Sequence, residues 1–286
     1  MNTKTLKLTI YEPNSNKTSF FSSLIAIIKD IIPAHELAVR LFKRDIKAQY
    51  RQSFLGFFWV LIPPLLTAGL WIFLNNNKII AVGKTDIPYP LFVMIGTILW
   101  QVFAEGVNQP RVSVSADKGM LTKINFPREA LLLSGFYTIM FNLVPKLLVL
   151  VTACYFFKVE LNYSQLYFPL GVLIISLIGF SIGLLLTPAA LLIPDIARGI
   201  GIILPFAMYL TPVIYPAPTT SGYFALLMQY NPLATLLSSS RGWLSGNLDY
   251  IPYEFLSISG FTLLFLFIGV LAYRISMPII TERFGG

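Results

Sequence analysis

The chain has 286 residues, of which 56% are hydrophobic and only 12% are charged, and its formal net charge is +8. A mean hydropathy of +0.72 excludes an ordinary soluble domain of this size. We therefore attribute the positive charge to membrane topology, and we expect no binding of nucleic acid. The single cysteine excludes an intrachain disulfide, and the single histidine cannot by itself build a metal site.

Residues 1–33 are expected to form a cytoplasmic N-terminal extension with no motif of its own. Residues 34–55 show the pattern of an amphipathic helix that lies on the membrane surface and joins the first span directly. Leu41 does not fit the apolar side of this pattern. The basic side consists of Arg40, Lys43, Arg44, Lys47 and Arg51. We expect these cations to face lipid phosphates or an acidic partner, and the alternative is a lipid anchor with no further role.

Six hydrophobic stretches are long enough to cross a hydrocarbon core of roughly 30 Å. They lie at about 56–74, 90–109, 130–157, 167–190, 199–216 and 255–273, and a short tail follows. Because little polar sequence separates them, residues 34–286 are predicted to be one all-helical, multi-pass membrane domain. In the fourth stretch, Gly179 and Gly183 predict a close contact between helices.

The lysines and arginines fall unevenly on the two sides of these six spans. The side that holds both termini has 16 of them and the opposite side has 4, with Lys146 inside the third span. Positive residues accumulate on the cytoplasmic side of membrane proteins. Both termini are therefore predicted to be cytoplasmic.

Lys146 lies deep in a predicted span, where a lysine costs about 3 kcal/mol unless it faces water or a partner. Two interpretations are open. Lys146 either faces a polar pathway and attracts an anionic substrate, or it reaches the interface or bonds a backbone carbonyl freed by Pro145.

The segment 217–254, before the last span, is apolar but holds no span, so we expect two short re-entrant helices with a turn at Asn231-Pro232. Such helices would cap a pathway through the membrane. Aromatic faces stack on sugar rings, so some aromatic residues are candidates to line it, the alternative being that they face lipid or the core. The candidates are Trp100, Phe103, Tyr209 and Tyr215.

The sequence contains no P-loop, no nucleophile elbow and no metal-ligand spacing, and its spans hold no cluster of carboxylates. We therefore predict that the chain is not an enzyme and binds no metal. Any transport against a gradient would draw its energy from a separate subunit.

Four groups of residues stand in order along the chain. They are Arg44-Asp45-Ile46-Lys47 with Leu55-Gly56, Leu121-Thr122-Lys123 with Phe126-Pro127-Arg128-Glu129, Thr211-Pro212-Val213-Ile214-Tyr215-Pro216, and Asn231-Pro232-Leu233 with Arg241. Together they resemble the motifs of type-2 ABC exporter permeases, and in particular the branch that exports polysaccharides and polyol phosphates. The resemblance covers roughly residues 35–285. One departure is Pro194-Asp195, where the family usually carries Arg-Asp.

The resemblance implies a permease homodimer in the bacterial plasma (inner) membrane, with two ATPase subunits beneath it that hold ATP and Mg²⁺. This chain itself would bind no cofactor. The implied substrate is a lipid-linked glycan, with O-antigen favoured and capsule or teichoic acid as alternatives, and the basic helix would recruit its pyrophosphate head group. The implied ATPase contacts are Arg111, Lys118, Lys123, Phe126 and Arg128. Lys146, Asn231 and Arg241 join the four aromatic residues as channel or gate candidates.

Three other functions remain as alternatives. A membrane-embedded enzyme that modifies glycolipids would need clustered carboxylates or histidines. An exporter of drugs or small lipids on the same fold would respond to other substrates. A passive channel would not need a cytoplasmic docking surface.

Overall fold

The computed structural model describes residues 20–51, 56–79, 83, 85–124, 126–216 and 222–285. All regular secondary structure within these ranges is helical, as predicted. Most of the predicted N-terminal extension, residues 52–55 of the predicted surface helix and residue 125 of the predicted contact loop lie outside the described residues.

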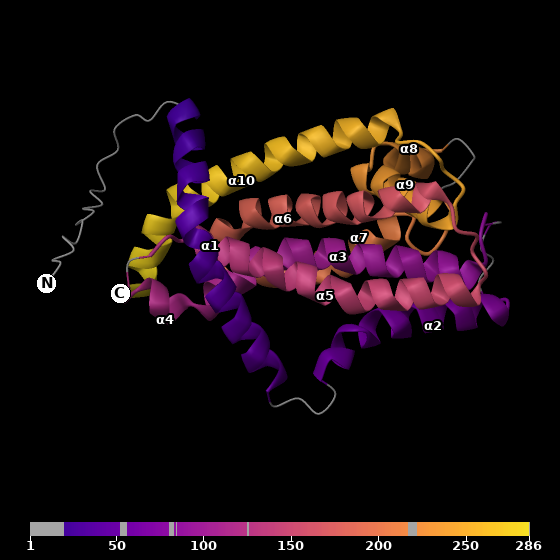
Figure 1. The fold of residues 1–286 in the computed structure, drawn as a ribbon, viewed down its shortest axis with the longest axis horizontal. Coiled ribbons are helices and arrows are strands. Elements are labelled where there is room, and N and C mark those ends of the chain that lie inside the picture. Colours follow the sequence, from indigo (N-terminus) through magenta and orange to yellow (C-terminus); the bar gives the residue numbers. More distant parts are fainter. Residues whose placement is uncertain are drawn as a thin grey trace, which may run out of the picture.

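The longer helices are α1 (Phe20–Tyr50), α2 (Ile62–Asn76), α3 (Tyr89–Ala116), α5 (Glu129–Phe156), α6 (Phe168–Leu192), α7 (Pro194–Ala207), α9 (Pro232–Ser245) and α10 (Tyr253–Gly285). The shorter ones are α4 (Lys118–Leu121), α8 (Tyr223–Gln229) and the 3-10 helices η1 (Gly56–Val60), η2 (Tyr163–Tyr167) and η3 (Met208–Leu210). In Figure 1, α3, α5 and α6 run side by side along the bundle. α4 and the C-terminus lie at one end, and α8 and α9 lie at the other.

The surface helix differs from its predicted bounds of 34–55. α1 starts earlier, at Phe20, because the apolar sequence before residue 33 continues the helix, and it ends at Tyr50. The expected direct join to the first span falls on residues 52–55, outside the described residues; the described chain resumes with η1, and α2 starts at Ile62. In Figure 1, α1 and α2 run in different directions. Gly56, the first residue of η1, has a φ of +47°, a left-handed conformation that glycine adopts without strain.

α1 packs on α5 through Ala34, Ala38 and Leu41, which are buried at helical spacing. Leu41 did not fit the predicted apolar side because that prediction considered lipid alone, whereas the buried stripe faces the bundle. The cations of the basic side are exposed on the outside of the helix.

Among the described residues, five helices are long and apolar enough to cross a membrane, and they correspond to the predicted spans other than the fifth. In place of the fifth, the structure has α7, a helix of 14 residues that rises only about 21 Å, followed by η3 and an irregular segment 211–216. Pro212 and Pro216 lack the backbone N–H that would continue the helix. The chain nevertheless returns from the end of α6 to the end of α8 and α9 over this segment (Figure 1).

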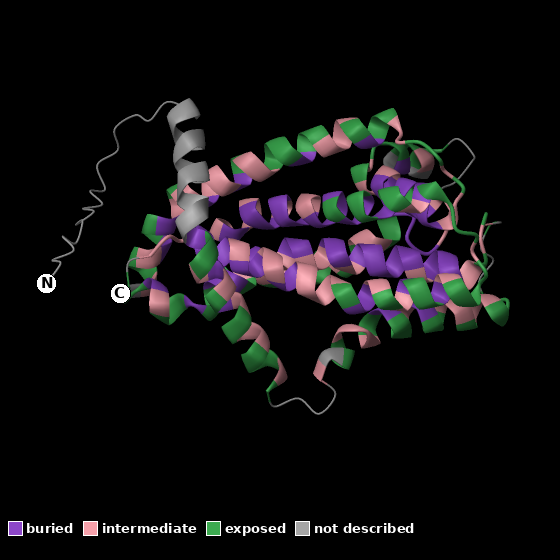
Figure 2. Cartoon of the chain, in the orientation of Figure 1, coloured by how far each residue is buried: buried purple, intermediate pink, exposed green. Residues whose placement is uncertain are grey.

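The core lies between α3 and α6, which carry most of the buried residues in Figure 2. A Cβ atom on Gly179 would lie 2.4 Å from the carbonyl oxygen of Phe103, and one on Gly183 would lie 2.5 Å from that of Val107. The two backbones therefore touch, which confirms the predicted close contact. By contrast, only 11% of the spanning part of α2 and 17% of that of α10 are buried.

Candidate functional site

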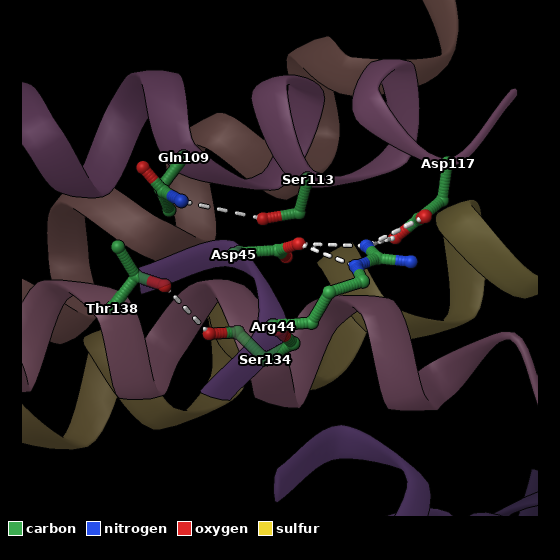
Figure 3. A network of polar contacts seen from close by, with 7 residues as sticks. All are labelled: Arg44, Asp45, Gln109, Ser113, Asp117, Ser134 and Thr138. Atoms are coloured by element: carbon green, nitrogen blue, oxygen red, sulfur yellow. Dashed lines mark hydrogen bonds and ion pairs between the residues drawn. The ribbon is translucent and has the colours of Figure 1, made fainter. Parts of the chain in front are cut away.

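The α4 end of the bundle is formed by α4, the first turn of α5 and the last turns of α10, with α1 crossing beside it (Figure 1). Here the guanidinium of Arg44 on α1 joins two carboxylates (Figure 3). Its Nη2 atom lies 2.7 and 2.9 Å from the two carboxylate oxygens of Asp117, the residue that precedes α4. Its Nε and Nη2 atoms lie 2.8 and 2.7 Å from Oδ1 of Asp45. One cation thus connects α1 to the start of α4.

The electrostatics of this group favour a permanent charge on Arg44. Burial lowers the pKa of Arg44, but the hydrogen bonds to Asp45 and Asp117 outweigh burial, and the pKa is raised overall. Burial raises the pKa of Asp45 above its usual range, and the hydrogen bond from Arg44 opposes that rise. The side chain of Asp117 is only 7% exposed, so Arg44 is the cation that compensates a nearly buried carboxylate.

Further contacts hold the elements of the α4 end together. The Nζ atom of Lys118 lies 4.5 Å from the ring centroid of Phe284 on α10. The Tyr273 hydroxyl donates to the backbone carbonyl of Arg128 at 3.1 Å, and Arg274 lies 3.6 Å from a carboxylate oxygen of Glu129. α4 and the start of α5 are therefore fixed against α10.

The predicted ATPase contacts all lie toward this end, but they differ in accessibility. Lys118 and Lys123 are exposed. Phe126 and Arg128 are half-buried, and Phe126 packs against the apolar cluster under α1. Arg111 is half-buried farther back in α3. The structure thus brings the two lysines to the surface and leaves the other three as partly packed residues.

The predicted head-group cations divide into two kinds. Arg44 is occupied by Asp45 and Asp117. The other four are exposed, and the described part of the chain supplies no ion-pair partner for them; they are Arg40, Lys43, Lys47 and Arg51. Only these four are available to an external phosphate.

Lys146 is fully buried, and its Nζ atom lies 2.5 Å from Oε1 of Glu105 on α3. Neither sequence-based interpretation named this partner. Near it, Oε2 of Glu105 and Oδ1 of Asn142 are buried and find no hydrogen-bond partner in the described residues. Burial raises the pKa of Tyr50, at the end of α1, and the charge of Glu105 raises it further, so α1 ends close to this pair.

Polar residues recur at every fourth position on the facing sides of α3 and α5. On α3 they are Glu105, Gln109 and Ser113, followed by Asp117 just after the helix, and on α5 they are Ser134, Thr138, Asn142 and Lys146. Figure 3 shows the part of this series nearest α4, where Gln109 donates to Ser113 at 3.3 Å. Residues four positions apart lie on one face of a helix, so this spacing in the sequence indicates that Glu105 and Asp117 face α5. Neither residue was predicted from this spacing.

The aromatic candidates lie in two places. Trp100 and Phe103 contact each other at a centroid distance of 5.1 Å and are 5% and 6% exposed, so they belong to the packed core of this chain. Tyr209 is half-exposed, and the Tyr215 hydroxyl donates to its backbone carbonyl at 2.5 Å. Only the second pair borders open space on this chain.

At the far end, Arg241 on α9 holds the irregular segment 211–216. Its guanidinium donates to the carbonyls of Pro212 at 3.2 Å and Val213 at 3.0 Å, and it lies 3.6 Å from the ring centroid of Phe92. The side chain of Asn231 accepts from the backbone of Leu233 and caps α9, which confirms the predicted turn. The gate candidates of this end therefore converge on one segment.

Comparison with known proteins identifies a family and several relatives. Residues 36–244 match the model of the family described as ABC-2 type transporter. The chain is 26% identical over 219 residues to the O-antigen export system permease protein RfbA of Myxococcus xanthus, covering 76% of this chain and 83% of that protein. It is 27% identical over 234 residues to the protein of the same name in Klebsiella pneumoniae, covering 80% and 88%. It is 24% identical over 249 residues to the polysialic acid transport protein KpsM of Escherichia coli, covering 82% and 91%.

Proposed function

The chain belongs to the ABC-2 type transporter family, and on this premise we propose that it is the permease subunit of an exporter of lipid-linked polysaccharide in the bacterial inner membrane. The observation that carries the proposal is the family match, which includes the second half of the basic helix α1 and nearly all of α9. O-antigen is the proposed substrate because the O-antigen permeases are 26–27% identical to this chain, against 24% for the polysialic acid transporter. Capsule polysaccharide and teichoic acid are the alternatives.

We propose six crossings with both termini in the cytoplasm. Five long helices alone would leave the termini on opposite sides. The return of the chain through α7 and η3 supplies a sixth crossing in the proposal, because it joins the two ends of the bundle (Figure 1). The excess of lysine and arginine on the side of the termini supports this orientation.

The proposed ATPase subunit docks at the α4 end. ATP and Mg²⁺ would be held by that subunit, and this chain would present Lys118 and Lys123, which are exposed there. The partly packed Phe126 would transmit a push from the partner into the apolar cluster that also contains Leu41 of α1. The four unpaired cations of α1 would attract the phosphate groups of the substrate lipid.

The proposed homodimer buries the face formed by α2 and α7. These two elements lie together, because Trp71 contacts Tyr209 just beyond α7 at a centroid distance of 6.2 Å. α7 has no buried residue, and large apolar side chains such as Leu66, Ile203 and Phe206 are more than 60% exposed on this face. A second copy would cover them, and the glycan would pass between the copies below α8 and α9.

The test is purification of the tagged protein in a mild detergent together with deletion of its gene. We expect an ABC-type ATPase to co-purify in a 1:1 ratio, and we expect surface glycan to disappear from the deletion strain while lipid-linked precursor accumulates. An intact dimer without an ATPase, in a host that still displays its glycan, would refute the proposal and favour a stand-alone membrane enzyme or channel.

A further inference from the structure

Asp117 links α1 to α4 in the proposed exporter. Its carboxylate accepts hydrogen bonds from Arg44 on α1. Its backbone carbonyl accepts the first hydrogen bonds of α4, from the N–H groups of Met120 at 2.9 Å and Leu121 at 3.0 Å. The position of this one residue therefore sets both the start of α4 and the place where α1 is held.

The bond between Arg44 and Asp117 resists separation because Asp117 is nearly buried. A carboxylate in that position loses the compensating cation if Arg44 leaves, which is strongly unfavourable. Asp45 adds a second constraint, since its bonds to Nε and Nη2 fix the orientation of the guanidinium toward α4. A planar guanidinium can serve both carboxylates at once, and a lysine ammonium offers no such fork.

α1 has a separate attachment to α5 that does not involve α4. The Nδ1 atom of His35 lies 2.7 Å from the hydroxyl of Tyr137, and the ring of Phe42 contacts those of Tyr137 and Phe141. Without Arg44, α1 would still lie on α5, but the ion pair that joins it to the start of α4 would be lost. The two attachments can therefore be separated by mutation.

We propose that Arg44 and Asp117 are positioning residues that make α1 and α4 move as one unit during export. A push on α4 then reaches the surface helix across the guanidinium, in addition to the apolar cluster that Leu121 of α4 shares with Leu41 of α1. This inference rests on the proposed function for the source of the push, and it assigns Arg44 a role different from recruitment of a substrate head group.

The first test uses the protein alone and measures the distance between α1 and α4. Spin labels are placed at Glu36→Cys and Gly119→Cys, both exposed positions, in a Cys154→Ala background. We expect a narrow distance distribution in the parent, a broader one in Arg44→Gln and in Asp117→Asn, and a narrow one again in the charge exchange Arg44→Asp with Asp117→Arg. Arg198→Gln is the matched control, because Arg198 pairs at 3.0 Å with Asp195 of its own helix. Equal widths in the parent and both single variants would overturn the link.

The second test uses the full complex with its ATPase in liposomes and measures glycan exported per ATP hydrolysed. We expect this ratio to fall about tenfold in the single variants, a typical size for coupling between two sites, while ATP hydrolysis continues. The charge exchange should restore the ratio. A ratio unchanged in the single variants would refute the positioning role, even if the distances broaden. Absence of export by the unmodified complex would instead count against the proposed function, and the distance measurement on the protein alone would stand.

Discussion

Lys146 on α5 and Glu105 on α3 form an ion pair inside the spanning part of the bundle, with 2.5 Å between Nζ and Oε1. The lysine side chain is fully buried, whereas that of the glutamate is 30% exposed. A buried pair of this kind adds little net stability compared with apolar residues of the same size, but either charge left alone is expensive. The pair therefore explains how a lysine is tolerated at this depth.

The first prediction follows from the cost of leaving one charge of this pair without its partner. Lys146→Met alone should destabilise the protein by about 3 kcal/mol, because it leaves Glu105 without its cation. The double variant with Glu105→Leu should regain most of the loss. Thermal unfolding of the purified protein in detergent measures both. A single variant as stable as the double would contradict the account.

The second prediction concerns the contact between α3 and α6. Gly179→Ala should cost about 2 kcal/mol, because its methyl group would meet the backbone oxygen of Phe103, which no side-chain rotation can relieve. Gly260→Ala on α10 is the control, since no atom lies within 4 Å of its added methyl group. Unfolding temperatures of the two variants provide the comparison. Equal losses would show that α3 and α6 have room to separate.

The third prediction tests the far end of the bundle. Arg241→Met should cost about 2–3 kcal/mol, because it leaves the buried carbonyls of Pro212 and Val213 without donors. Export should fall with it, since the gate candidates converge on this segment. Arg198→Met, which removes an exposed arginine, should leave both quantities unchanged. Thermal unfolding and surface glycan display are the two measurements, and an Arg241→Met protein with parental stability would be the contrary result.

The fourth prediction concerns topology and is made in a Cys154→Ala background. Single cysteines at Lys118 and Asp195 should be shielded in intact cells from a maleimide that cannot cross the membrane. Single cysteines at Tyr223 and Tyr230, both highly exposed, should be labelled. Labelling at both Asp195 and Tyr223 would show that the chain does not cross the membrane through α7.

Five of the predicted spans and the contact at Gly179 were predictable because they depend on local features of the sequence. Hydrophobic length marks a membrane helix, and two glycines four residues apart expose a strip of backbone. The turn before α9 was predictable for the same reason, since Asn231 and Pro232 begin the helix by local chemistry. None of these features needs knowledge of a distant residue.

The role of Arg44 was not predictable in the same way. Its partner Asp117 lies 73 residues away, and nothing in the basic pattern of α1 distinguishes Arg44 from its exposed neighbours. Leu41 failed to fit for a related reason, since its burial depends on α5. The fifth span was predicted to continue to residue 216, whereas α7 ends at Ala207. A hydropathy average contains no information about where prolines end a helix.

The backbone contact between α3 and α6 also bears on how the protein is made. All of α5 is synthesised between these two helices, and α6 ends at Leu192, whereas α3 ends at Ala116. At the usual 5–20 residues per second, α3 waits about 4–15 s in the membrane before its main packing partner is complete. During that interval the glycine at position 106 faces lipid or the insertion machinery rather than the backbone of α6. A chain that stops before α6 would therefore leave this strip of α3 backbone uncovered.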